Sequence, residues 1–258
     1  MYTSPKMSQS HMNYQLIGNS SQSAEIGVLL PTYREAENIS NLIDDIEGLK
    51  LNSTILVIDD SSPDQTAEIV QEKQSKYNNI LLCIRPKKSG LGTAITDGFK
   101  FFLDSKSPPK YIITMDADYS HNPKDIPRLI STMNETDCGI AVGSRYIKGG
   151  HIENWPFTRK IISRTANSIA KFSLGLKPHD CTSGFRCYST KFLCEIIGNL
   201  HSHTYEIQIE TIRQAHLRNF DVRETPILFI NRKSGKSKLS WTEIRSYITY
   251  NLKAILHS

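Results

Sequence analysis

The sequence contains no long apolar run. Within its 258 residues, no stretch approaches the roughly 18 apolar residues that a membrane-spanning helix needs. The amino-terminal region also lacks the apolar core of a secretory signal. We therefore expect a chain that by itself neither crosses a membrane nor enters a secretory route, and we expect it in the cytoplasm.

The cysteine pattern of a zinc site or a disulfide framework is also missing. The chain has five cysteines, an odd number, and none of them forms a C-x-x-C pair. His201 and His203 are one residue apart, but an isolated pair of this kind is more often part of a solvated loop than of a metal site. We expect free thiols in a reducing compartment.

Acidic residues are scarce in one part of the second half. The whole chain carries a formal net charge of +5, which is mild. The segment from Arg145 to Lys171, however, contains Glu153 as its single acidic residue. Its cations are Arg145, Lys148, Arg159, Lys160, Arg164 and Lys171. These cations lack the interleaved aromatic residues on which a single-strand-binding surface stacks bases. We therefore expect small anionic ligands and no nucleic-acid partner.

Strand and helix patterns alternate along the first half of the chain. Short apolar runs at strand length are each followed by apolar residues at helical spacing. The runs are 26–30, 54–58, 80–84, 111–115 and 139–142. Five such units predict an α/β fold with a doubly wound, mainly parallel sheet.

The ends of the chain differ from this pattern. Residues 1–24 are polar and have no apolar period, so we predict a disordered tail. Residues 25–240 form the predicted main domain. Residues 241–258 carry an apolar stripe that starts at Trp241 and predicts an amphipathic helix. Packing on the core and contact with a membrane surface or partner are both open for this helix.

Two carboxylates follow the strand predicted over 111–115. Asp116 and Asp118 lie two residues apart, so in extended chain they point the same way. Ligands of open α/β sheets bind outside the carboxyl ends of the strands, and paired carboxylate oxygens suit Mg²⁺ or Mn²⁺. A structural alternative is that these acids belong to a turn that caps the helix after Pro123.

Three further segments have a predicted role. Ser89–Gly92 opens a helix, but the third glycine of a dinucleotide fingerprint would fall at Ile95, so we predict a turn that lets the helix pack closely. The segment Arg232–Lys238 has four cations around one glycine and predicts a mobile, anion-binding loop. Asp180 begins a polar loop, and both a general base and a structural turn remain open for it.

Five motifs in register resemble a known family. They are Leu29–Glu35, Val57–Asp64, Met115–Pro123, Gly143–Tyr146 and Arg159–Arg164. They resemble the family 2 glycosyltransferases of GT-A fold, in particular the dolichol-phosphate mannose synthases and related polyprenyl-phosphate glycosyltransferases. The resemblance covers about residues 25–240.

The resemblance implies a set of site residues. It assigns Asp116, Asp118 and Ser120 to a divalent metal, Mg²⁺ or Mn²⁺. Catalytic roles fall to Asp118, Arg145, Arg159 and Arg232. The residues implied to bind the nucleotide sugar are Pro31, Tyr33, Glu35, Asp59, Asp60, Asp116, Ala117, Ser163 and Lys238.

The resemblance also implies an activity. It is the inverting transfer of mannose from GDP-mannose to a polyprenyl (dolichyl) phosphate, at the cytosolic face of a membrane. The protein would bind that surface peripherally through an interfacial helix or through membrane-spanning partner subunits. The alternatives are a UDP-glucose-dependent polyprenyl-phosphate glucosyltransferase and a non-catalytic nucleotide-sugar binding module. A phosphate acceptor is largely dianionic at neutral pH, so we expect no essential general base.

Overall fold

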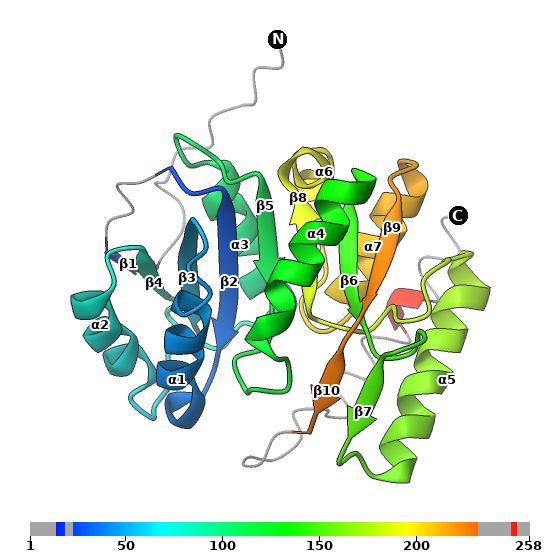
Figure 1. Cartoon of the computed structure of the whole chain (residues 1–258), viewed down its shortest axis with the longest axis horizontal. Helices are drawn as coiled ribbons and strands as arrows, with labels where there is room; N and C mark the ends of the chain where they lie inside the picture. The colour runs from blue at the N-terminus through cyan, green and yellow to red at the C-terminus, as the bar shows by residue number, and fades with distance from the viewer. Residues whose placement is uncertain (1–13, 19–22, 232–248, 252–258) are drawn as a thin grey trace.

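The computed structural model describes residues 14–18, 23–231 and 249–251. One large mixed sheet, in the order β1-β4-β3-β2-β5-β8-β6-β9, runs through the molecule with helices on both faces (Figure 1). A second sheet of two strands lies beside it. The predicted α/β class with a mainly parallel sheet is confirmed.

Parallel strands form the amino-terminal half of the sheet. They are β2 (Ile26–Thr32), β3 (Ser53–Asp59), β4 (Ile80–Ile84) and β5 (Tyr111–Thr114). Every residue of β3 is buried, because helices cover both faces of the sheet and shield the side chains on each face from solvent. The helices α1 (Ala36–Glu47), α2 (Thr66–Lys76) and α4 (Ile126–Thr136) cover one face. The helices α3 (Leu91–Leu103), α6 (Thr190–Ile196) and α7 (Ile207–Leu217) cover the other.

The carboxyl-terminal half completes the large sheet with β6 (Ile140–Ser144), β8 (Arg186–Ser189) and β9 (Val222–Pro226). The strand β8 is antiparallel to both neighbours, β5 and β6. The small sheet pairs β7 (His151–Glu153) with β10 (Leu228–Ile230). Two 3-10 helices, η2 (Pro123–Asp125) and η3 (Ile197–Asn199), and the long helix α5 (Phe157–Leu174) complete these elements.

Strand β8 was not predicted from the sequence, because the strand begins with a charged residue, Arg186. Arg186 is fully buried, and its guanidinium donates to the carbonyl oxygens of Ser183, Cys181 and Gln208 at 2.7, 2.9 and 2.6 Å. A buried cation is tolerated where its donors are satisfied in this way. The loop predicted over 180–186 therefore turns directly into a central strand.

The predicted disordered tail is wrong for residues 15–17. These residues form β1 (Gln15–Ile17), an edge strand antiparallel to β4. Ile17 packs against the core, and its carbonyl oxygen accepts from Gln74 Nε2 at 2.9 Å. Three residues are too few to give a period, so only the pairing with β4 identifies them.

Two other predictions concern regions that are described in part. Residues 249–251 are helical, and the rest of the predicted helix over 241–258 lies outside the described residues. Within the described part of the chain, no helix is long and apolar enough to cross a membrane. All five cysteines are free thiols, as predicted, and four of them are buried.

Candidate active site

A cavity of about 300 Å³ lies where three neighbouring strands end. The strands β3, β2 and β5 are adjacent and parallel, so the residues that follow them meet at one edge of the sheet. The cavity is lined by Pro31, Thr32, Tyr33, Glu35, Asp60, Lys88, Gly90, Leu91, Ala94, Asp116, Ala117, Asp118, Thr204 and Tyr205. Seven of the predicted site residues therefore share one cavity: Pro31, Tyr33, Glu35, Asp60, Asp116, Ala117 and Asp118.

Two cations lie close to the Tyr33 ring at this cavity. Lys88 Nζ is 4.3 Å from the centre of the Tyr33 ring, and Arg34 Cζ is 5.5 Å from it. Cations at these distances are attracted to the face of an aromatic ring. Lys88 also lines the cavity, although the sequence analysis had not identified it as a site residue.

The two acids after β3 have different surroundings. Asp59 is fully buried and accepts from Thr32 Oγ1 at 2.9 Å and from the Ser62 backbone N–H at 2.7 Å. It lies outside the cavity lining, where it joins β2 to the turn after β3. Asp60 faces the cavity and pairs with Arg85, whose Nε donates to Asp60 Oδ1 at 2.5 Å.

A loop from the second half of the chain also lines the cavity, through Thr204 and Tyr205. A Cβ at Gly90 or Gly92 would collide with the carbonyl oxygen of His203 or Ser202, so only glycine allows this approach. The predicted close packing at the glycine turn is confirmed. The loop is held by two carboxylates that accept backbone N–H groups: Glu210 from His201 and Ser202, and Glu206 from His203 and Thr204. Among the described residues, no group of three or more His, Cys, Asp or Glu side chains could hold a metal ion.

The predicted metal ligands lie in a tight turn after β5. Asp118 Oδ1 accepts from the Ser120 backbone N–H at 3.1 Å, and Tyr119 takes a left-handed conformation. Ser120 is buried, and its hydroxyl has no hydrogen-bond partner among the described residues. Two carboxylates at one cavity and a nearby unsatisfied hydroxyl are oxygen donors that fit Mg²⁺ or Mn²⁺, which retain positions for water and phosphate.

His121 fixes the start of this turn. Its Nδ1 accepts from the Asp116 backbone N–H at 3.2 Å, and its ring stacks on Phe185 with centroids 5.1 Å apart. Burial lowers the pKa of His121 to about 4, so the ring is neutral near pH 7 and keeps its acceptor nitrogen. The Ile230 backbone N–H donates to Ser120 O at 3.1 Å, which brings the end of β10 beside the same turn.

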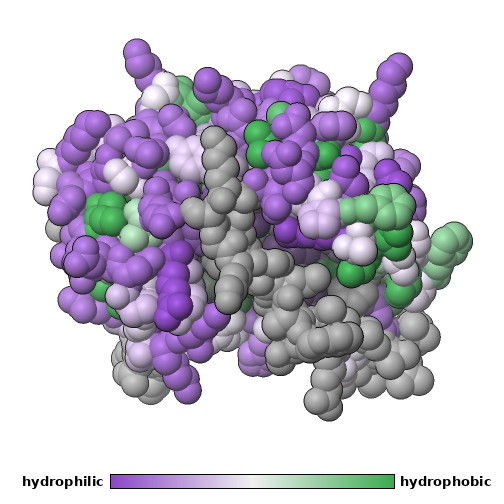
Figure 2. All heavy atoms as spheres, turned by 90° about the horizontal axis from the view of Figure 1, so that it is seen from below, coloured by the Kyte–Doolittle hydropathy of each residue, from purple (hydrophilic) through white to green (hydrophobic). Residues whose placement is uncertain are grey.

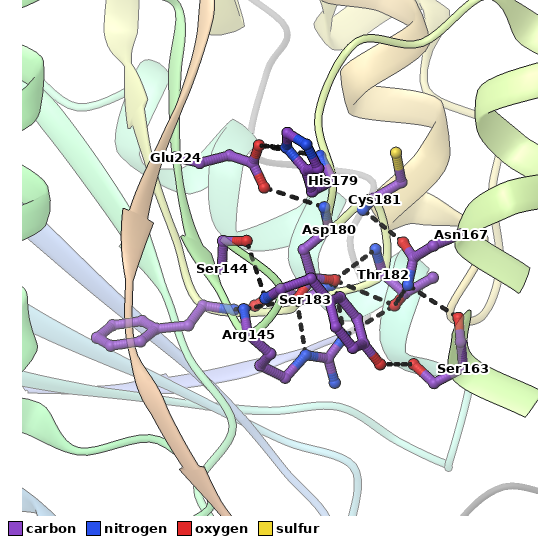
Figure 3. A network of polar contacts seen from close by, with 12 residues as sticks. Ser144, Arg145, Ser163, Asn167, His179, Asp180, Cys181, Thr182, Ser183 and Glu224 are labelled. Atoms are coloured by element: carbon purple, nitrogen blue, oxygen red, sulfur yellow. Dashed lines mark hydrogen bonds and ion pairs between the residues drawn. The ribbon is translucent and has the colours of Figure 1, made fainter. Parts of the chain in front are cut away.

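Arg145 and Asp180 form a buried ion pair beyond the cavity lining (Figure 3). Arg145 Nε donates to Asp180 Oδ2 at 2.7 Å and Nη2 donates to Oδ1 at 2.8 Å. The Arg145 and Ser183 backbone N–H groups also donate to this carboxylate, both at 3.0 Å. Burial would raise the pKa of Asp180, but the Arg145 charge outweighs it and the pKa lies below its ordinary value. A carboxylate with both oxygens engaged in this way fits the structural role better than the role of a base.

Of the remaining predicted residues, Arg159 lies beside the end of β10. Arg159 Nη1 donates to Asn231 Oδ1 at 2.9 Å, and its guanidinium lies 4.2 Å from the Trp155 ring centre. Ser163 Oγ accepts from the Tyr146 hydroxyl at 2.7 Å. Arg232 and Lys238 lie outside the described residues.

The family follows from comparison with known proteins. Residues 27–197 match the glycosyl transferase family 2 domain. The chain belongs to glycosyltransferase family 2. The predicted family is confirmed, and with it the prediction that the protein is an enzyme.

Two relatives cover most of the chain. A polyprenol monophosphomannose synthase of Mycolicibacterium smegmatis is 36% identical over 220 residues, which are 84% of this chain and 82% of the relative. An undecaprenyl-phosphate mannosyltransferase of Micrococcus luteus is 34% identical over 214 residues, 82% of this chain and 86% of the relative.

Solved structures support the GT-A fold. Glucosyl-3-phosphoglycerate synthase from Mycobacterium tuberculosis, crystallised with Mn²⁺, UDP and phosphoglyceric acid, matches with a TM-score of 0.67 at 15% identity, over 90% of this chain and 78% of that chain. A mannosyltransferase from Pyrobaculum calidifontis, solved with GDP-Man and Mn²⁺, matches with a TM-score of 0.62 at 10% identity, over 94% of this chain and 68% of that chain.

Arg85 is the residue through which this glycosyltransferase holds Asp60. It is 4% exposed and also donates to Thr93 Oγ1 at 2.8 Å, Asp97 Oδ2 at 3.1 Å and Gly90 O at 3.1 Å. It therefore connects the acid of the cavity to the glycine turn and to α3. Sequence reasoning missed Arg85, because a single arginine after a strand forms no recognisable motif.

We expect Arg85→Ala to raise KM for the donor about tenfold or more, with a smaller effect on kcat, because Asp60 would lose its position. It should also cost about 3–5 kcal/mol of stability, because Asp60 stays buried without the cation that pairs with it. Arg85→Lys should recover part of both. Steady-state kinetics and thermal melting measure the two effects.

Lys73→Ala is the matched control, since Lys73 pairs with the more exposed Asp44 at the same 2.5 Å distance. That change should cost no more than about 1 kcal/mol and leave KM unchanged. If Arg85→Ala lowers stability while KM for the donor stays constant, Arg85 has a structural role alone.

Proposed function

We propose that the protein transfers mannose from GDP-mannose to the phosphate of a polyprenol. Both relatives that cover most of the chain are named as enzymes that join mannose to a polyprenol phosphate carrier. The observation that carries the proposal is that Asp116, Asp118, Tyr33, Asp60 and Lys88 line one cavity. It offers groups of the kinds that a nucleoside, a metal and a diphosphate require.

The donor's nucleoside would bind at the β2 side of this cavity. The Tyr33 ring and the carboxylates of Glu35 and Asp60 offer a stacking surface and acceptors for hydroxyl or base N–H groups. Lys88 supplies a positive charge close to the same ring, which suits a diphosphate. The pairing with Arg85 and the Ser89 backbone N–H holds Asp60 in place before a donor arrives.

Asp116, Asp118 and the Ser120 hydroxyl would hold a divalent cation, Mg²⁺ or Mn²⁺. The two solved relatives described above were crystallised with Mn²⁺. Such an ion neutralises the charge that develops on a departing diphosphate. This chain's own contribution is the turn geometry, which His121 and the left-handed Tyr119 fix.

The acceptor phosphate would approach from the side of β10. Arg159 contacts Asn231, the last described residue before Arg232, and Ile230 pairs with Ser120. Cations from this region would let two anions approach each other. Roles for Ser163, Arg232 and Lys238 in phosphate binding remain part of this proposal. A phosphate acceptor needs no base, in keeping with the engaged carboxylate of Asp180.

A polyprenyl phosphate is carried in a membrane, so we place the protein peripherally at its cytosolic face. Membrane-spanning partner subunits could supply further attachment. Both statements depend on the proposed acceptor.

A donor panel tests the proposed function. GDP-mannose and UDP-glucose would each be incubated with a short-chain polyprenyl phosphate and Mg²⁺ or Mn²⁺, and the glycolipid product would be measured. We expect transfer from GDP-mannose to exceed transfer from UDP-glucose by at least about 100-fold, about 2.7 kcal/mol of discrimination. Preference for UDP-glucose would favour the glucosyltransferase alternative. Donor binding without transfer or hydrolysis would favour the binding module and contradict the proposal.

A further inference from the structure

Helix α5 (Phe157–Leu174) exposes an unusual number of apolar side chains. Seven large hydrophobic side chains are exposed in the described part of the protein, and five of them lie on α5: Phe157, Ile161, Ile162, Ile169 and Phe172. Phe157 is 77% exposed and Phe172 is 91% exposed. Figure 2 shows hydrophobic residues gathered on the right-hand side of the molecule, where Figure 1 places α5.

These side chains share one face of the helix. At 100° per residue, Phe157, Ile161 and Phe172 fall in one narrow arc, and Ile169 and Ile162 extend it on one side. The opposite face is buried through Asn167 and Ala170. We call the outward set, Phe157, Ile161, Ile162, Ile169 and Phe172, the α5 face. An apolar stripe this wide on the outside of a protein indicates a surface that something covers.

The charge around the α5 face indicates what covers it. The helix contains no acidic residue, and Lys160, Arg164 and Lys171 recur at i, i+4 and i+11 along one edge. Such cations extend their apolar stems over the stripe and keep their charges at its border. An apolar face bordered by cations is complementary to the headgroup region of an anionic bilayer. A second copy docked through the same face would set cations against cations, which is unfavourable.

We propose that the α5 face docks on an anionic lipid surface, with Phe157 and Phe172 inserted at the level of the headgroups. The cations along its edge contact lipid phosphates. The docking site is thus a described helix, separate from the predicted amphipathic helix over 241–258.

The inner side of α5 connects this surface to the candidate active site. Asn167 Oδ1 accepts from the Cys181 backbone N–H at 2.7 Å, and its Nδ2 donates to Thr182 Oγ1 at 3.1 Å. Thr182 Oγ1 in turn accepts from Arg145 Nη2 at 2.8 Å. The helix that contacts lipid therefore also holds the loop that positions Arg145 (Figure 3). This step rests on the proposed function, in which a lipid-borne phosphate reaches the site from the same surface.

Vesicle sedimentation with the full chain tests the docking. Vesicles of equal parts phosphatidylglycerol and phosphatidylcholine would be compared with phosphatidylcholine alone, at low salt. We expect wild type to prefer the anionic vesicles, and Phe157→Ser/Phe172→Ser to bind them at least about tenfold more weakly. Leu217→Ser is the matched control, because Leu217 is also exposed, at 54%, but lies on α7. It should bind like wild type, and thermal melting verifies that all variants are folded.

A second pair of changes separates charge from apolar contact. Lys160→Glu/Lys171→Glu should reduce binding to anionic vesicles and remove the preference over phosphatidylcholine. The proposal is overturned if wild type binds neither vesicle, or if the serine variant binds as wild type does. It is equally overturned if the α5 face instead mediates self-association, measured by analytical ultracentrifugation without lipid.

Transfer to a short, water-soluble polyprenyl phosphate distinguishes this proposal from the proposed function. Phe157→Ser/Phe172→Ser should keep wild-type transfer in that assay, because the acceptor no longer has to be reached in a bilayer. Loss of vesicle binding with transfer retained supports docking through α5. Transfer without any wild-type vesicle binding leaves the proposed function standing and refutes the docking.

Discussion

Asp118→Ala is expected to reduce sugar transfer by about 10³-fold or more while the protein stays folded. Asp118 lies at the cavity, and Asp116 and Asp118 are the carboxylates proposed to hold the metal. Removing one of two such ligands leaves the diphosphate charge without its main stabilisation. Asp118 accepts a hydrogen bond from the Ser120 backbone N–H, and a bond of this kind to a charged group contributes about 1.5–3 kcal/mol, a loss that leaves the protein folded.

Two controls make this result specific. Asp104→Ala removes an exposed carboxylate at the end of α3, outside the cavity lining, and should leave transfer unchanged. Wild type in excess chelator should match Asp118→Ala, and calorimetry should find that the variant binds Mn²⁺ more weakly than wild type does. Full transfer by the variant, or by wild type in chelator, would contradict the proposed metal site.

The candidate cavity was largely predictable because it depends on parallel strands. When neighbouring strands run the same way, the residues after each of them meet at one edge. This is why Tyr33, Asp60 and Asp116, which are far apart in the sequence, could be placed together. Periodicity identified the strands, and the acids that follow each strand identified the edge.

The same logic could not place residues that depend on a fold-specific contact. The loop around Thr204 forms a wall of the cavity because Gly90 and Gly92 allow its carbonyl groups to approach. Asp59 and Asp60 are neighbours of identical type, yet one is buried against Thr32 and Ser62 while the other faces the cavity. Alternation along a strand end decides this difference, and a one-residue uncertainty in the end of β3 hides it.

Arg145 also illustrates this limit. Its charge indicated a phosphate-binding role, but a partner 35 residues away in the chain, Asp180, uses two of its guanidinium nitrogens. Ring centres of Trp155 and Phe229 lie 5.3 Å from its guanidinium. In the structure, Arg145 therefore has a structural role, because these contacts hold the loop of Asp180 against Trp155 and Phe229. Whether it also contacts phosphate stays a prediction.

Asp180→Asn is expected to impair both folding stability and transfer, without changing the pH profile of transfer. Its carboxylate is fully buried and faces N–H donors of Arg145 and Ser183. An amide would turn its own N–H groups toward some of these donors and leave the Arg145 charge buried without an anion. Breaking a buried pair in this way costs about 3–5 kcal/mol. Urea denaturation of variant and wild type measures the loss.

Asp221→Asn is the matched control, because Asp221 pairs with Arg223 at the surface, where both side chains are more than half exposed. It should cost less than about 1 kcal/mol. The double variant Arg145→Met/Asp180→Asn should recover stability relative to Asp180→Asn, because no charge is left unpaired and the amide oxygen can still accept from the backbone N–H groups, but it should not recover transfer. If Asp180→Asn is as stable as wild type, the ion pair does not hold this part of the site.

The pH dependence of stability and of transfer distinguishes a structural role of Asp180 from a role as a general base. The pKa of Asp180 is lower in the folded protein than in the unfolded chain, where it is about 3.9. The ionised carboxylate therefore contributes its full stabilisation of the fold above about pH 3.9, and this contribution is lost as the pH falls through the pKa of the folded state. Wild type should therefore lose stability on acidification below about pH 4, and Asp180→Asn should show a flatter dependence there. The acidic limb of transfer should instead lie near pH 6, where the acceptor phosphate gains a proton, and should be the same in both proteins. If Asp180→Asn removes that limb, Asp180 is a base and the phosphate dianion is not the nucleophile that we propose.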